Sequence, residues 1–322
     1  MSTDAPDAAA RLATLFGRMV MAATALTFVV IVASAFMRHT QAGLSCADWP
    51  ACYAALGAPG TDGGPSPGVH LARIAHRLAA TSVLALVIGL LLIAWTQKPA
   101  WKRAGRLALA ALAIAGALAV LGIATPGARV PAVTLGNLLG GYAMLAALVA
   151  TYAVTAGAPS PLRGARGVAA IALAFVFVQA ALGGLIGAQF ASLACPALVD
   201  CGAWTWREFL DAGALDPLRP VVTNDGHVIA PAGAAGLHAL HRLCGLATAA
   251  LALATAAMFR RLRPRLALAI AAVVVIAATL GLFAVSPQPA LPVIVAHNAC
   301  AAILVALLAA ARAREPTPAR CT

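Results

Sequence analysis

The chain has 322 residues, of which 62% are hydrophobic and only 10% charged, and its mean hydropathy is +0.92. This composition excludes a water-soluble globular protein, whose surface would be too apolar, and indicates a polytopic membrane protein. The net charge of +12 could suit nucleic acid, but the basic residues lie between apolar runs, where they set membrane orientation. Nucleic acid is therefore not expected as a partner.

Eight apolar runs are each long enough to cross about 30 Å of hydrocarbon as a helix. The first run follows a polar, Ala-rich segment with Asp4 and Asp7, and it is long enough to remain as an anchor rather than be cleaved as a signal peptide. The predicted fold class is an all-α polytopic membrane protein. The expected spans are residues 16–37, 71–95, 107–125, 131–156, 167–190, 236–258, 266–285 and 291–311.

The basic residues predict the orientation of these spans. Most of the 22 Lys and Arg residues fall near the two termini and in the loops after the second, fourth and sixth spans. The positive-inside rule then places both termini in the cytoplasm and the other loops, including the long one from about 191 to 235, outside. The expected location is the cytoplasmic (inner) membrane, surrounded by lipid.

Two of the outer loops carry cysteines at the same spacing, Cys46 with Cys52 and Cys195 with Cys201. Each pair follows a similar string, AGLSC or ASLAC. Disulfides persist on the outer side of a membrane. Two interpretations stay open: disulfides that close short loops, or redox-active dithiols that exchange electrons with an outside thiol carrier.

The order of features repeats along the chain. A His-Arg-Leu triplet opens both the second span, at His76, and the sixth span, at His241. Asn137 lies in the fourth span where His297 lies in the eighth. Together with the cysteine pairs, these features indicate two parallel repeats of four helices.

The repeat divides the chain into residues 1–156 and 157–322, each predicted to form a four-helix bundle. Even-numbered spans enter the membrane from its outer face, so their polar residues lie at one depth, roughly 8–9 Å along the helix from the outer end of each span. A flat macrocycle fits between the second and fourth helices of such a bundle. Two neutral imidazoles on facing helices can hold a haem iron from both sides, which predicts His241 and His297 as haem ligands and His76 as the corresponding ligand in the first half.

Other basic and titratable side chains lie near these positions. Arg77 and Arg242 directly follow the span-opening histidines and are predicted to pair with haem propionates. His238 lies three residues before the sixth-span ligand and shares its helix face. It is either a partner of that ligand, a replacement ligand, or an interfacial residue without a role. His39 and His227 are expected to be solvated in outer loops.

The strings AGLSCADWPACY, AHRLAA, LGNLLGG, ASLAC, LHRLCG and AHNACAA resemble haem A synthase, the CtaA family, over nearly the whole chain. The resemblance implies a bis-histidine haem b in the C-terminal half, carried onto His241 and His297. It also implies an N-terminal half that oxidises a methyl group of haem O to the formyl group of haem A for terminal oxidases. Such an enzyme receives haem O, handed over by a haem O synthase, and delivers electrons to an acceptor such as a quinone or a thiol.

Two positions depart from the family pattern. Asn137 stands where the family has a fourth-span His, and Arg73 stands where it has a Glu three residues before His76. Without that carboxylate, the proton acceptor is expected to be water, His70 or Asp62. Asn137 is expected to line the haem site, but an amide is a poor iron ligand, so one face of the iron in this half is expected to be open.

These departures leave a second function open, a non-catalytic haem carrier or assembly partner that has lost the oxidation site. A membrane thiol oxidoreductase, resting on the outer cysteines alone, is a third. The glycine pairs Gly140-Gly141 and Gly183-Gly184 permit close helix contacts, either within the chain or in a homo-oligomer.

Overall fold

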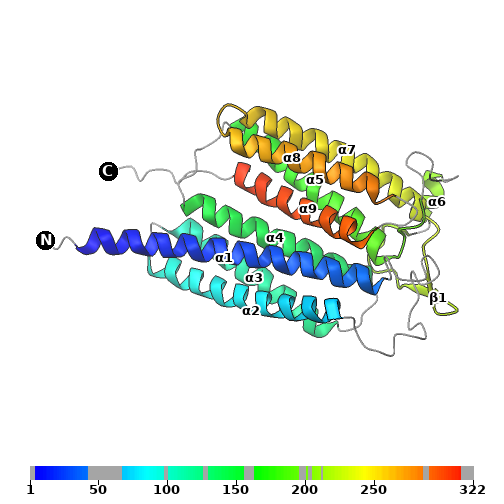
Figure 1. Cartoon of the computed structure of the whole chain (residues 1–322), viewed down its shortest axis with the longest axis horizontal. Helices are drawn as coiled ribbons and strands as arrows, with labels where there is room; N and C mark the ends of the chain where they lie inside the picture. Colours follow the sequence, from blue (N-terminus) through cyan, green and yellow to red (C-terminus); the bar gives the residue numbers. More distant parts are fainter. Residues whose placement is uncertain are drawn as a thin grey trace.

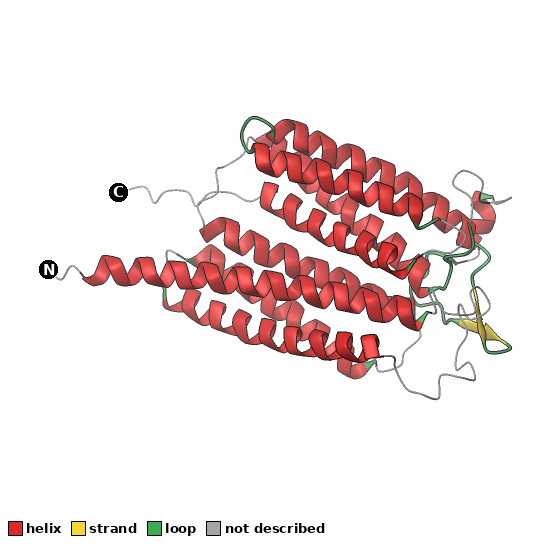
Figure 2. Ribbon diagram, in the orientation of Figure 1, coloured by secondary structure: helices red, strands yellow, loops and turns green. Residues whose placement is uncertain are grey.

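The computed structural model describes residues 4–42, 67–97, 101–125, 130–155, 163–195, 201, 205–211, 213–285 and 290–312. Within these ranges the chain forms nine helices and one two-stranded sheet (Figures 1 and 2). Eight of the helices, all but α6, are long and apolar enough to cross a membrane, which confirms the predicted all-α polytopic fold. The elements are α1 Asp4–Gln41, α2 Pro67–Thr96, α3 Lys102–Ala124, α4 Pro131–Thr155, α5 Arg163–Ala188, α6 Trp206–Asp211, β1 Val222–Asn224, β2 His227–Ile229, α7 Ala234–Phe259, α8 Pro264–Phe283 and α9 Leu291–Arg312.

Prolines begin several of these helices, and threonine hydroxyls inside the spans form hydrogen bonds with the backbone. Pro67, Pro131 and Pro264 are the first residues of α2, α4 and α8, where the missing N–H costs nothing because it would have no partner inside the helix. Within the spans, the hydroxyls of Thr27 and Thr255 donate to the carbonyl four residues earlier, at 2.8 and 2.9 Å. Each hydroxyl thereby finds an acceptor where no water is at hand.

The eight long helices pack as two rings of four. In the first ring α1 packs on α2 and α4, and α3 also packs on both. In the second ring α5 packs on α7 and α9, and α8 also packs on both. The second and fourth long helices of each half therefore lie at opposite corners of their ring. The duplication behind this likeness stays a prediction.

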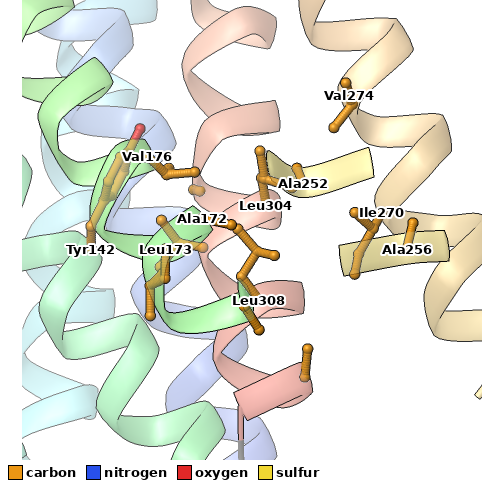
Figure 3. Packing of buried hydrophobic residues seen from close by; sticks show 14 of the residues in the cluster. Tyr142, Ala172, Leu173, Val176, Ala252, Ala256, Ile270, Val274, Leu304 and Leu308 are labelled. Atoms are coloured by element: carbon orange, nitrogen blue, oxygen red, sulfur yellow. The ribbon is translucent and has the colours of Figure 1, made fainter. Parts of the chain in front are cut away.

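The two rings meet along a contact that we call the seam, formed by α1 and α4 on one side and α5 and α9 on the other. Figure 3 shows part of its core, a buried cluster to which α4 contributes Tyr142, α5 contributes Leu173 and α9 contributes Leu304. A β-carbon at Gly184 would come within 2.8 Å of the Leu135 side chain, so glycine allows α4 and α5 to approach. Gly184 of the Gly183-Gly184 pair thus serves a helix contact within the chain.

The end of the molecule at which α1 finishes carries α6 and an antiparallel hairpin of β1 and β2, neither of which the sequence analysis predicts (Figure 1). Asp225 turns the hairpin with a φ of 47°. Val228 packs with Ala42 just after α1 and with Ile294 of α9, so the hairpin covers this end of the seam. The start of α1 and the end of α9 lie at the opposite end (Figure 1).

One expectation about the outer loops is wrong. His39 does not lie in a solvated loop, because α1 continues to Gln41 and leaves His39 only 7% exposed. The apolar run ends near residue 37, but the helix extends beyond it and packs there against α5, where a β-carbon at Gly187 would lie 3.4 Å from the His39 ring. His227, by contrast, is exposed on β2 as expected.

Candidate functional site

His297 lies on α9, and its ring is held by α8. Its Nδ1 donates a hydrogen bond to the carbonyl oxygen of Ala277 at 3.0 Å. A β-carbon at Gly281 would approach the ring Cε1 to 3.3 Å, so glycine lets α8 lie against the imidazole. Because a carbonyl oxygen only accepts, the neutral ring carries its proton on Nδ1 and keeps the Nε2 lone pair for a ligand.

His241 lies on α7, and its ring is held by α5. The side-chain amide of Gln179 donates from Nε2 to Nε2 of His241 at 3.2 Å. A β-carbon at Gly183 would lie 3.0 Å from the His241 Cε1, and one at Gly245 would lie 3.1 Å from the Gln179 amide nitrogen. Two glycines, one on each helix, therefore create the space in which the imidazole and the amide meet.

The two imidazoles belong to one interior. Helices α7 and α9 occupy opposite corners of the second ring, and His297 contributes to the electrostatic environment of His241. Two neutral imidazoles from facing helices, one of them oriented by a backbone carbonyl, form a donor set that fits a haem iron. His297 fits with its present hydrogen bond intact.

His241 can bind a haem iron only after it changes its hydrogen bond to Gln179. One lone pair cannot serve both the Gln179 amide and an iron, so Nε2 must release the amide on ligation. The atoms for the exchange are present: Nδ1 of His241 and Oε1 of Gln179 are both inaccessible and without a hydrogen-bond partner. An Nδ1–H that donates to a side-chain oxygen is the usual way to orient an imidazole ligand.

The hairpin end of α7 is tied to the loop that follows α5. Cys195 and Cys201 form a disulfide with their Cα atoms 4.5 Å apart, as predicted. The Arg242 guanidinium donates to Cys201 Sγ at 3.5 Å and to the Cys195 carbonyl oxygen at 3.1 Å. His238 donates from Nε2 to the carbonyl oxygen of Ala191 at 2.8 Å. Both side chains contact the loop, and the propionate role of Arg242 stays a prediction.

The N-terminal half places its predicted residues differently. His76 lies half-buried on α2, while Arg77 and His70 on the same helix are exposed. Asn137 on α4 is also exposed, and its amide donates to the carbonyl oxygen of Val133 in its own helix at 2.9 Å. Cys46, Cys52 and Asp62 lie outside the described residues. The structure therefore brings only the C-terminal pair together with oriented ring nitrogens.

Three polar residues of this region are not predicted from the sequence: Gln179, and Arg38 and Asn298, which are hydrogen-bonded to each other across the seam at 3.5 Å. Gln179 could have been noted as an amide inside an apolar span, since such residues are rare in membranes and usually have a partner. The partners themselves depend on contacts between distant parts of the chain, which no local pattern indicates.

Two comparisons with known proteins agree with this geometry. A family model, COX15-CtaA, described as cytochrome oxidase assembly protein, matches residues 69–309. The haem A synthase of Shewanella oneidensis is 27% identical over 307 residues, which cover 88% of this chain and 91% of that protein. The matched region contains both imidazoles of the C-terminal pair.

Proposed function

The chain belongs to the COX15-CtaA family of cytochrome oxidase assembly proteins, and we propose that it is a haem A synthase, a membrane oxidoreductase that converts a methyl group of haem O to the formyl group of haem A. The likeness to the Shewanella oneidensis haem A synthase supports the reaction. The observation that carries the proposal is the facing pair His241 and His297, with its oriented nitrogens and glycine clearance.

The C-terminal half is proposed to hold haem b as a resident cofactor. When bound, this group supplies reversible one-electron transfer. The protein's part is to orient the ligands: the Ala277 carbonyl fixes the tautomer of His297, and Gln179 is placed to do the same for His241 after the exchange of hydrogen bonds. Both imidazoles remain neutral donors in an interior that excludes water.

The N-terminal half is proposed to receive haem O as the substrate. His76 is the expected iron ligand, and the adjacent Arg77 is exposed and can pair with a propionate. Asn137 adds no strong ligand, so one face of the substrate stays accessible. His70 is exposed one to two turns before His76 on α2 and is the proposed proton acceptor, together with water.

The membrane orientation of the proposed enzyme follows the basic residues. Both termini are cytoplasmic, and the hairpin end with the Cys195–Cys201 disulfide faces outward. Exposed apolar side chains such as Ile123 and Leu246, 80% and 71% exposed, suit contact with lipid. Haem O reaches the site from a haem O synthase. With water as the source of the formyl oxygen, the electrons removed from the methyl group leave to a quinone or to the disulfide form of a thiol carrier.

The test is to purify the full-length protein from cells that also produce haem O, and to separate the extracted haems by chromatography. Haem A should appear with the wild type and should disappear with His76→Ala, while the spectrum of the C-terminal haem persists. Haem O that stays unchanged in folded, haem-loaded wild type would exclude the enzyme.

One observation favours a second candidate, a non-catalytic haem carrier or assembly partner. Asn137 is exposed and its amide is bonded to its own helix, so the N-terminal half shows one imidazole where the C-terminal half shows two. The carrier predicts bound haem b and no haem A under any condition. The same extraction experiment therefore separates the two functions.

A further inference from the structure

A buried cation lies on the seam, outside both predicted ligand sets. Arg38, near the hairpin end of α1, donates from Nη2 to the side-chain oxygen of Asn298 at 3.5 Å. Its Nε is inaccessible and has no hydrogen-bond partner. Tyr142 donates to the backbone carbonyl of Asn298 at 3.1 Å and so fixes that segment of α9. A guanidinium stays charged in a protein, so this charge is held in an interior position with only a neutral amide as its acceptor.

His39, the next residue, adds a second polar atom without a partner. Its side chain is only 7% exposed, and its Nε2 is inaccessible and makes no hydrogen bond to the described residues. Its ring lies against Gly187 of α5, where a β-carbon would approach to 3.4 Å. Two neighbouring residues thus present unpaired ring and guanidinium nitrogens inside the seam. Nitrogens of this kind donate to anionic oxygens.

Among the residues that the structure describes, no anion lies at this depth. None of the eight spans contains Asp or Glu, and among the described residues no carboxylate forms an ion pair with Arg38. A charge removed from water is destabilising unless an opposite charge and hydrogen bonds compensate it. A carboxylate or phosphate of a ligand would supply the compensating charge.

The position of the two residues indicates which ligand. His39 lies against Gly187, and His241 lies against Gly183, four residues earlier on the same helix. Four residues of helix rise about 6 Å, so His39 lies about one turn closer to the hairpin end than the His241 imidazole. Asn298, the acceptor of Arg38, directly follows the α9 ligand in the sequence. The His39 ring therefore lies on the hairpin side of the ligand pair, and Arg38 contacts α9 beside His297.

We propose that Arg38 and His39, with Asn298, form a carboxylate-binding site that takes a propionate of the haem held between His241 and His297. This inference rests on the proposed function, which supplies that haem. A haem carries two carboxylates on one edge, and a guanidinium with an unpaired Nε–H can bind one of them through charge-assisted hydrogen bonds. Helix α1 of the N-terminal half then helps to hold the cofactor of the C-terminal half.

The test compares haem b with its dimethyl ester, in which both carboxylates are blocked. Full-length protein produced without haem is placed in phosphatidylcholine nanodiscs and titrated with each form. The wild type should bind the free acid about ten- to hundredfold more tightly than the ester. Arg38→Gln should remove most of this preference, and Arg38→Lys, which keeps the charge, should keep part of it. Arg18→Gln, an exposed arginine at the other end of α1, is the matched control and should retain the wild-type ratio.

Each other outcome has a defined meaning. If Arg38→Gln weakens acid and ester equally, or retains the wild-type ratio, the site is structural and the inference is overturned. If phosphatidylglycerol in the nanodisc removes the preference of the wild type but does not affect Arg38→Gln, the anion is a lipid phosphate and the propionate assignment is wrong. If Arg38→Gln does not fold, the His39→Gln variant is titrated instead, and it must reduce the ratio of the affinities for the free acid and the ester. A wild type that binds neither haem form with a bis-histidine spectrum contradicts the proposed function itself, whereas a wild type that binds both equally contradicts only this inference.

Discussion

The two halves present their predicted ligands in different settings. In the C-terminal half, His297 and His241 each have a hydrogen-bond partner on a neighbouring helix and a glycine against the ring. In the N-terminal half, His76 is half-buried with no hydrogen-bond partner among the described residues, and Asn137 is exposed and bonded to its own helix. The C-terminal half orients His297 in advance and places Gln179 beside His241, whereas the N-terminal half orients neither of its candidates.

This difference suits the proposed division of work. An imidazole that is already oriented loses little freedom when it binds, which favours tight and permanent binding. A substrate has to enter, react and leave as product, so a half whose one imidazole has no hydrogen-bond partner among the described residues, and whose other face is open, is suited to turnover. Pre-orientation thus separates a resident cofactor from a substrate more clearly than the identity of the ligands does.

The largest expected effect is loss of the oriented pair. His297→Ala removes one of the two proposed iron ligands and should lower haem content by at least about tenfold, because even partners that only orient a ligand contribute ten- to hundredfold. The six-coordinate spectrum of the C-terminal haem should disappear, as measured by reduced-minus-oxidised difference spectra of purified protein. His76→Ala should leave that spectrum unchanged and affect only the N-terminal half.

The control for this comparison is His227→Ala, which replaces an exposed imidazole on β2 and should leave haem content at the wild-type level. Equal loss of the spectrum in His76→Ala and His297→Ala would contradict the distinction between the halves. It would show instead that both histidines serve one haem or that either change prevents folding, and size-exclusion chromatography separates these two cases.

The sequence predicts the parts of this architecture that depend on local hydropathy. Eight spans are recognisable because each contains some twenty apolar residues, and the pair His241 and His297 follows from their matched depth. The hairpin from Val222 to Ile229 is missed because three-residue strands leave almost no pattern. His39 is placed wrongly because the helix continues past its apolar run, and the partner of His241, Gln179, is missed because it lies 62 residues away. Contacts between distant segments require the packed structure.

A smaller effect is expected from the glycines that make room for the imidazoles. Gly183→Ala places a β-carbon 3.0 Å from the His241 ring, which must then shift. Overpacking of this kind costs about 1–3 kcal/mol, so haem affinity should fall roughly tenfold. Gly281→Ala, with its contact at 3.3 Å, should have a weaker effect.

Gly167→Ala is the matched control for these variants, since it lies on the same helix as Gly183 and its β-carbon would meet nothing within 4 Å. Haem titration by absorbance measures all three. A Gly183→Ala protein with wild-type affinity would show that the His241 ring is not confined by α5, and the pre-orientation argument would then rest on His297 alone.

The smallest effect concerns the arginines that follow the span-opening histidines. Arg242 is tied to the disulfide loop through Cys201 Sγ and the Cys195 carbonyl, whereas Arg77 is exposed. Arg242→Gln should therefore lower the free energy of unfolding by about 1 kcal/mol, the lower range for hydrogen bonds of a charged donor because the group is only partly buried. Arg77→Gln should leave it unchanged. Thermal unfolding of protein loaded only with the C-terminal haem measures both variants. Equal unfolding midpoints would show that the loop contacts of Arg242 add no stability. Propionate binding would then be the one difference to look for between the two arginines.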